Sequence, residues 1–164
     1  THTSVWLNPR DSGQVKRWEE TMSIESILRR KGTDVAKIGP EASIKSATDR
    51  LRAKRIGALV VTSGNAVLGL ISEREIVHAF SRYGETAGAM SVKEIMQHGA
   101  TTVSPDESVN RAMNLMTRHH MRHILVLRSG ELAGIVSIGD VVKHRLEDLE
   151  LETNVLRDVY NAAR

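Results

Sequence analysis

The chain contains an internal duplication that limits the folds open to it. Residues 38–78 align with residues 103–143, an offset of 65 positions, without a gap. Seven of the 41 aligned pairs are identical, and most other apolar positions stay apolar in both copies. Such self-similarity indicates two copies of one supersecondary unit. The identical pairs are Pro40/Pro105, Ser43/Ser108, Ala47/Ala112, Val61/Val126, Gly69/Gly134, Ser72/Ser137 and Val77/Val142.

The sequence pattern of each copy predicts five elements in the order strand, helix, strand, strand, helix. A short strand ends at Pro40, because proline cannot donate to a strand ladder. Ser43 follows as the N-cap of a helix whose apolar residues recur at a spacing of three to four. Two apolar runs separated by "SGN" then indicate a hairpin, and a second helix begins after Ser72. The same signals recur in the second copy, with "RSG" at the hairpin turn.

The remaining segments flank these two copies. A short helix that Gly32 ends is expected within residues 22–34, and "SVKEIMQ" predicts a second short helix between the copies. The last helix is expected to continue almost to the C-terminus, and its apolar stripe needs something to pack on. That stripe contains Val142, Leu146, Leu149, Leu156 and Tyr160. The predicted division is an N-terminal arm at 1–21, repeat 1 at 22–82, a linker with a short helix at 83–97, repeat 2 at 98–145 and a helical extension at 146–164.

Composition and charge argue against several functions. The chain has no cysteine, which excludes disulfides, thiolate metal sites and a cysteine nucleophile, and suits the cytoplasm. No apolar run approaches the roughly 18 residues of a membrane span, and residues 1–21 lack the apolar core of a signal peptide. The net charge of +3 argues only weakly for a polyanionic partner. The sequence shows no recognised arrangement of nucleophile and base and no glycine-rich phosphate loop, so we expect no enzymatic activity.

The histidine-rich stretch "RHHMRH" raises the question of a metal site. Its histidines, His119, His120 and His123, span the expected end of a helix and the start of a strand. No carboxylate or cysteine lies beside them, so their convergence on one ion is not expected. We therefore predict no metal.

The two copies resemble a tandem pair of CBS (cystathionine β-synthase) domains, the regulatory unit also called a Bateman module. The likeness lies in "TVSPDESVNRAMNLMTRHHMRHILVL" with "GELAGIVSIGDVV", and in "AKIGPEASIKSATDRLRAKRIGALVV" with "VLGLISEREIV". It covers about residues 35–145 and is closest to stand-alone bacterial members. The resemblance implies an α/β (α+β) fold of two β-α-β-β-α repeats related by pseudo-twofold symmetry. It also implies a homodimer and action through assembly or on a protein target in trans.

Such pairs bind adenine-containing ligands between their repeats, AMP first among them, and also ADP, ATP, NAD(H) or S-adenosylmethionine. The family's crosswise arrangement, carried over to this sequence, implies two clefts. One would combine Ser137, Asp140 and Val136 with Ala36, Lys37, Ile56, Gly57 and Ala58. The other would combine Ser72, Arg74 and Glu75 with Thr101, Met121, Arg122 and His123.

The two clefts are expected to differ in chemistry. Asp140 can accept hydrogen bonds from both hydroxyls of a ribose, and Ser137 lies where a helix N-terminus can face a phosphate. The same spacing also fits simple helix capping, and the two roles are compatible. Glu75 stands where the family usually has aspartate, which puts its ribose contact in doubt. Its cleft gains cations from Arg74, Arg122 and His123, whereas Lys37 is the nearest candidate cation in the Asp140 cleft.

Two other functions remain open. A nucleic-acid-binding protein would use the basic N-terminal arm and a basic helix face made of Arg50, Arg52, Lys54 and Arg55, although solvated cations on a helix are commoner than such a site. A purely structural dimeriser would have clefts that have lost their ligand. The Glu75 departure and the absence of a cation at position 57 would support this second alternative.

Overall fold

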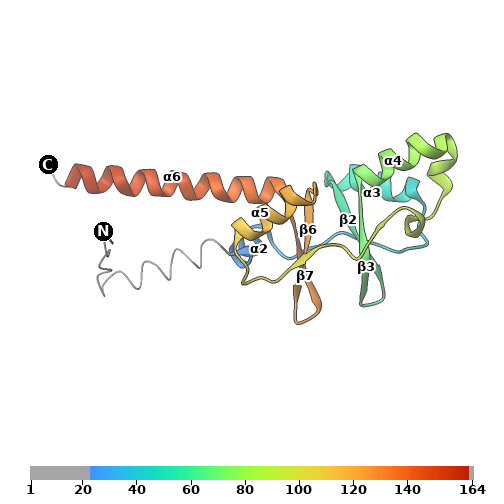
Figure 1. The fold of residues 1–164 in the computed structure, drawn as a ribbon, viewed down its shortest axis with the longest axis horizontal. Coiled ribbons are helices and arrows are strands. Elements are labelled where there is room, and N and C mark those ends of the chain that lie inside the picture. Colours follow the sequence, from blue (N-terminus) through green and yellow to red (C-terminus); the bar gives the residue numbers. More distant parts are fainter. Residues whose placement is uncertain (1–22, 163–164) are drawn as a thin grey trace, which may run out of the picture.

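The structure is a computed structural model and describes residues 23–162, so the predicted N-terminal arm lies outside the described residues. Both copies adopt the predicted order of elements around two β-sheets (Figure 1). The first copy comprises β1 (Lys37–Ile38), α3 (Ile44–Lys54), β2 (Ala58–Ser63), β3 (Ala66–Ser72) and α4 (Glu73–Tyr83). The second comprises β5 (Thr102–Val103), α5 (Val109–Arg118), β6 (His123–Arg128), β7 (Glu131–Ser137) and α6 (Ile138–Ala162). The other elements are α2 (Ile24–Lys31), η2 (Gly84–Ala89), η3 (Val92–Glu94) and β4 (Gln97–His98).

The predicted local signals are confirmed. Ser43 and Ser108 cap α3 and α5, and the two hydroxyls accept from the backbone amides of Ser46 and Arg111. In both copies the first strand pairs parallel with the second, and the second pairs antiparallel with the third. The short helix predicted between the copies is only one turn, η3. A capping box starts this turn, and the chain then extends as β4 along the edge of β3.

The central strands are buried on both faces, because successive side chains of a strand point to opposite sides. Leu59 and Val61 of β2 enter the core of the first repeat, beneath α3 and α4. Ala58 and Val60 face the other way and meet Leu125 of β6 in a core shared by the two repeats. The sheets therefore pack on each other at the centre of the molecule, and the helices cover their outer faces (Figure 1).

The segment that precedes each repeat packs on the other repeat. Helix α2 precedes the first repeat, yet Ile24, Ile27 and Leu28 are buried in the core of the second. Strand β4 precedes the second repeat, yet it extends the sheet of the first by pairing with β3. This exchange links the two copies at both ends and fixes the geometry of the space between them.

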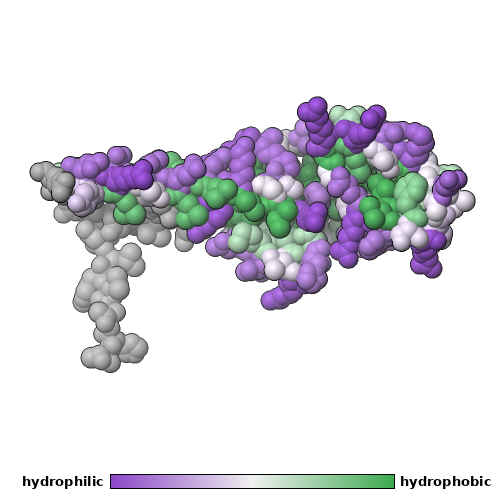
Figure 2. Space-filling view, turned by 90° about the horizontal axis from the view of Figure 1, so that it is seen from above, coloured by the Kyte–Doolittle hydropathy of each residue, from purple (hydrophilic) through white to green (hydrophobic). Residues whose placement is uncertain are grey.

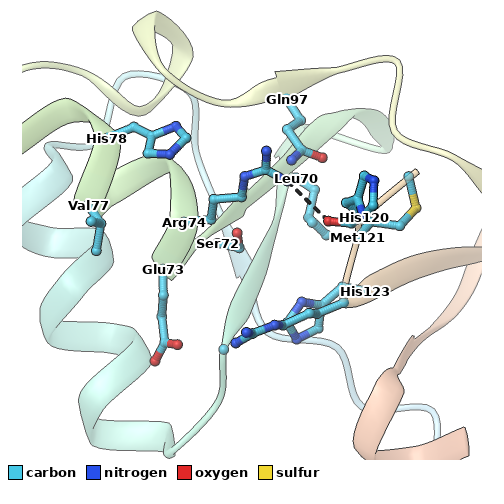
Figure 3. A pocket seen from close by; sticks show the side chains of 12 residues that line it. Leu70, Ser72, Glu73, Arg74, Val77, His78, Gln97, His120, Met121 and His123 are labelled. Atoms are coloured by element: carbon cyan, nitrogen blue, oxygen red, sulfur yellow. Dashed lines mark hydrogen bonds between the residues drawn. The ribbon is translucent and has the colours of Figure 1, made fainter. Parts of the chain in front are cut away.

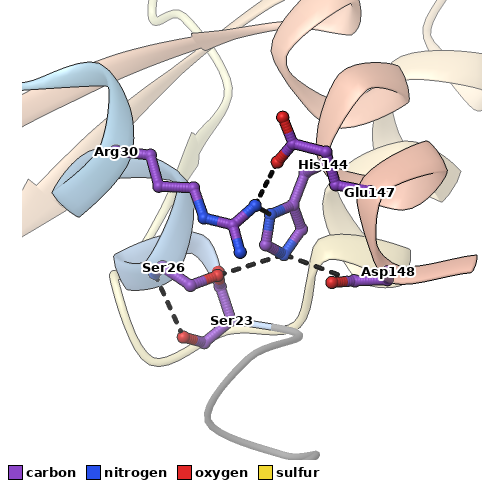
Figure 4. Close-up of polar contacts among 6 residues, drawn as sticks. All are labelled: Ser23, Ser26, Arg30, His144, Glu147 and Asp148. Carbon is purple, nitrogen blue, oxygen red and sulfur yellow. Dashed lines mark hydrogen bonds and ion pairs between the residues drawn. The ribbon is translucent and has the colours of Figure 1, made fainter. Parts of the chain in front are cut away.

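Polar contacts tie α2 to the first half of α6 (Figure 4). Ser26 Oγ lies 3.1 Å from Nε2 of His144, which is only 3% exposed. The same His144 nitrogen lies 3.5 Å from a carboxylate oxygen of Asp148, and Arg30 pairs with Glu147. Buried polar groups need such partners, so these contacts fix the angle at which α6 leaves the second repeat.

The far half of α6 extends beyond the rest of the described fold (Figure 1). Exposed apolar side chains run along α6, from Leu146 (56%) and Leu149 (43%) in its first half to Leu156 (70%) in its far half. Figure 2 shows this apolar surface as a run along the helix toward the body of the molecule. No helix within residues 23–162 is long and apolar enough to cross a membrane.

Candidate functional site

A cavity of about 470 Å³, here called the Asp140 cleft, lies between the repeats. The end of α3 and the start of β2 form one wall, and the end of β7 with the start of α6 forms the other. Its size falls within the range typical of small-molecule sites. The lining residues are Lys31, Asp34, Ala36, Lys54, Arg55, Ile56, Gly57, Ala58, His123, Ile135, Ser137 and Asp140.

Asp140 lies in the first turn of α6 and both caps the helix and faces this cleft. Its Oδ2 accepts from the backbone amide of Ser137 at 2.8 Å and from the Lys31 ammonium at 2.6 Å. Burial alone would raise the pKa of Asp140, but hydrogen bonds from Lys31 and Ser137 outweigh it and hold the pKa below its usual value. The residue therefore presents a charged acceptor at neutral pH, as recognition of a hydroxyl requires.

Most residues predicted for this cleft line it, but Lys37 and Val136 do not. Val136 is fully buried in the second core, since the alternation of β7 turns Ile135 toward the cleft instead. Lys37 is exposed on β1, where its carbonyl accepts from Arg50.

The cations of the Asp140 cleft are Lys31, Lys54 and Arg55, and none of them was predicted to lie there. Lys54 and Arg55 end α3, where Arg55 adopts a left-handed conformation with φ 53°. Because they directly precede Ile56, a predicted residue of this cleft, their position in the sequence could have indicated that they line it. Lys31 gave no such signal, because α2 reaches the cleft only through its packing on the distant repeat.

A second cavity of about 460 Å³, here called the Arg74 cleft, lies on the other side of the interface. Arg74 of α4 reaches across it and donates to the backbone carbonyl of His120 at 3.1 Å (Figure 3). The Arg74 cleft is rich in side chains that can bind an anion. Its lining residues are Gly57, Leu70, Ser72, Glu73, Arg74, Val77, His78, Gln97, His120, Met121, Arg122 and His123.

Glu75 and Thr101 are absent from the lining of the Arg74 cleft. Both carboxylate oxygens of Glu75 are engaged, one by the amide and hydroxyl of Ser72 and the other by the Gln97 amide at 2.7 Å. The Thr101 carbonyl accepts from Leu125 and extends the β5–β6 pairing. The carboxylate that lines this cleft is that of Glu73, which was not among the predicted site residues.

His123 forms part of both clefts, and so does Gly57. The imidazole fits against the bare backbone of the glycine, since a Cβ at position 57 would lie 3.1 Å from His123 Cε1. Burial lowers the pKa of His123 below its ordinary 6.5, and the Lys31 ammonium lowers it further. Asp140, Glu73 and Glu75 act in the opposite direction.

His123 is expected to make stability depend on pH. Because its pKa is depressed in the folded state, the unfolded chain binds the proton more readily as pH falls through 6.5. The free energy of unfolding is therefore expected to decline below that pH, by less than about 1.4 kcal/mol per pH unit. Urea denaturation between pH 8 and pH 5 measures the decline. It should be smaller in His123→Leu than in wild type, whereas the exposed His98→Gln serves as a control. A variant with an unchanged decline would contradict this assignment.

Parts of the histidine stretch and of the basic helix face line the two clefts. Within residues 23–162 no group of three histidine, aspartate or glutamate side chains is placed to hold a metal ion. The basic residues at the end of α3 differ in their contacts. Arg50 donates to the carbonyl of Lys37, while Lys54 and Arg55 line the Asp140 cleft.

Comparison with known proteins identifies the two copies. A family model described as a CBS domain matches the chain at residues 24–82 and again at 92–147. The chain is 31% identical over 153 residues to the mitochondrial CBS domain-containing protein CBSX3 of Arabidopsis thaliana, covering 85% of this chain and 74% of the relative. It is 26% identical over 116 residues to the CBS domain-containing protein YhcV of Bacillus subtilis, covering 71% and 82%. The crystal structure of a CBS-domain containing protein from Agrobacterium tumefaciens is 40% identical, with a TM-score of 0.74, and covers 75% of this chain and 92% of that one.

Proposed function

The chain belongs to the CBS-domain family, and on this premise we propose that it binds adenine nucleotides in the two clefts between its repeats. CBS-domain proteins are generally regulatory modules, and we propose that nucleotide occupancy is the signal here. The observation that carries the proposal is the charged Asp140 carboxylate, which lies on the wall of a cavity to which both repeats contribute.

The Asp140 cleft offers a group for each part of a nucleotide. Ile56, Ala58 and Ile135 supply apolar surface for the base. Asp140 supplies the acceptor for the ribose, and hydrogen bonds to a charged group contribute roughly 1.5–3 kcal/mol each. The cations Lys31, Lys54 and Arg55 are available for the phosphate. AMP is the ligand we favour, with ATP and NAD(H) as larger alternatives.

The Arg74 cleft is proposed as a second, different nucleotide site. Arg74 and Arg122 supply cations suited to a bidentate grip on a phosphate. Because Glu75 is engaged by Ser72 and Gln97, we propose that Glu73 takes the place of the ribose acceptor. The two clefts are therefore expected to differ in ligand preference.

A thermal-shift panel tests the proposed function. A ligand that binds only the folded state at a hundred times its Kd stabilises it by about 2.7 kcal/mol. For a chain of this size, such a gain raises the Tm by roughly 5 to 10 °C. AMP, ATP and NADH are expected to give shifts of this order, and GMP a much smaller one. An unshifted Tm with every adenine ligand would refute the proposal.

We also propose that the protein is a homodimer in which α6 packs against a second copy. Val142, Leu146 and Leu149 lie on one side of α6 and are 43–56% exposed in the single chain. Val77 and Phe80 of α4 are exposed as well. Burial of this apolar surface contributes roughly 25 cal/mol per Å². Such a dimer, or a protein target bound in trans, would transmit the signal, and the cytoplasm is the proposed compartment.

Leu146→Glu is expected to shift the protein toward the monomer. The substitution places a carboxylate in the proposed interface, and burial of an unpaired charge costs roughly several kcal/mol. Sedimentation velocity over a range of concentrations measures the change, with at least about tenfold weaker association expected. Leu151→Glu is the matched control, because Leu151 is similarly exposed but lies on the opposite side of α6. Equal behaviour of the two variants would exclude this interface.

A further inference from the structure

Lys31, the last residue of α2, occupies the acceptor that a ribose would use. Its ammonium donates to Asp140 Oδ2 at 2.6 Å and to the carbonyl of Ile135 at 2.9 Å. Both partners in the ion pair are partly buried, with 34% of the Lys31 side chain and 23% of the Asp140 side chain exposed. Partial burial makes this pair more costly to break than an ion pair at the surface.

The backbone of Lys31 is held in place, so only its side chain can move when a ligand enters the cleft. Helix α2 is anchored by its apolar face in the second core and by Ser26 and Arg30, which contact α6 (Figure 4). Gly32 ends the helix directly after Lys31 with a φ of 89°, which favours glycine. The flexible four-carbon stem of lysine lets the ammonium move within the cleft while its attachment point remains in place.

The Asp140 cleft carries an excess of positive charge. Lys31, Lys54 and Arg55 face two carboxylates, those of Asp34 and Asp140. A ligand that engages the Asp140 carboxylate through its ribose must displace or share the Lys31 ammonium. Unless that ligand brings an anion, it leaves the displaced ammonium without its counter-ion in a partly buried cleft.

We propose that Lys31 makes the Asp140 cleft selective for phosphorylated nucleotides over neutral nucleosides. A phosphate attracts the ammonium away from Asp140, and the freed carboxylate accepts from the ribose. Adenosine, which carries no charge, offers no such exchange. The inference rests on the proposed function, since it assigns a ligand class to the same cleft.

The first repeat has no ammonium in the position that corresponds to Lys31, so the same exchange cannot occur there. There, the carboxylate of Glu75 is held by the neutral amide of Gln97, which follows η3 along the edge of the sheet. A neutral amide is not drawn to a phosphate as an ammonium is. The proposed selectivity therefore belongs to the Asp140 cleft alone.

Calorimetric titration with AMP and with adenosine tests the role of Lys31. Binding that Asp140→Ala removes is assigned to this cleft. In the wild type we expect AMP to bind at least about 30-fold more tightly than adenosine, a difference of about 2 kcal/mol. In Lys31→Met, and likewise in Lys31→Gln, AMP should bind more weakly and adenosine more tightly, so that the ratio falls to about threefold. Lys45→Met is the control, since Lys45 pairs with Asp49 on the exposed face of α3.

The gain in adenosine affinity is the decisive result. A lysine that only contacts phosphate would weaken AMP without helping adenosine, and that result would overturn the exchange. A loss of affinity for both ligands in proportion would indicate a merely structural role and would also overturn it. Equal binding of AMP and adenosine to the wild type would overturn this inference but leave the proposed function standing. If neither ligand binds the wild type, the proposed function itself fails.

Discussion

Replacement of Asp140 by alanine is expected to abolish nucleotide binding in the Asp140 cleft. The carboxylate is the acceptor proposed for the ribose, and two hydrogen bonds to a charged group contribute roughly 3 kcal/mol or more together. Their loss corresponds to at least about 100-fold weaker binding of AMP. Calorimetric titration of wild type and variant measures the difference.

Glu75→Ala is the matched control for this experiment. Glu75 occupies the corresponding position in the first repeat, but Ser72 and Gln97 engage its two oxygens. Both substitutions remove a group that caps a helix, which costs about 1 kcal/mol of stability. Only Asp140→Ala should also remove affinity for AMP in this cleft. Retention of AMP binding by Asp140→Ala, with the same enthalpy and stoichiometry as wild type, would refute the assigned role.

Gly69→Ala is expected to be the most destabilising small substitution in the fold. Gly69 of β3 pairs with His98 of the neighbouring strand β4, and an alanine Cβ at position 69 would lie only 2.0 Å from the carbonyl oxygen of Gln97. The neighbour is backbone and cannot rotate away, so the β3–β4 pairing must open. Overpacking alone costs roughly 1–3 kcal/mol, and the lost strand pairing should bring the total above about 3 kcal/mol. Urea denaturation monitored by circular dichroism measures it.

Gly134→Ala supplies the comparison, because Gly134 is the duplicate of Gly69. Its added Cβ would lie 2.5 Å from Cδ2 of Leu28, which is a side-chain atom able to change rotamer. We therefore expect a smaller loss of stability, of roughly 1–3 kcal/mol. A Gly69→Ala protein as stable as Gly134→Ala would show that β4 does not hold the position described here.

Much of the fold could be predicted because its signals are local. The serines that cap α3 and α5 and the turns of both hairpins each act within a few positions of the chain, and the duplication shows the same signals twice. The continuous apolar runs of β2 and β6 likewise indicate strands that are buried on both faces. Elements whose state depends on a distant neighbour were less predictable. The stretch after Ser91 turns into β4 only because the edge of β3 is there to receive it.

The candidate site was predicted in part for the same reason. Ile56, Gly57 and Ala58 were placed opposite Asp140 through the family resemblance, and the structure brings them to one cavity. Val136 was predicted to line the cleft but lies one strand position away from the residue that does, and a shift of one position turns a side chain to the opposite face. Lys31 was missed because its contact with Asp140 spans 109 positions of the chain. No pattern within α2 indicates which repeat that helix will cover.

The exchange of α2 and β4 between the repeats means that neither copy is a self-sufficient folding unit. A fragment containing only the first copy would leave the edge of β3 unpaired, and such an edge invites intermolecular association. A fragment containing only the second would expose the apolar surface that Leu28 and its neighbours cover. The duplication visible in the sequence is thus a poor guide to where this protein can be cut, and the two halves should unfold in a single cooperative transition.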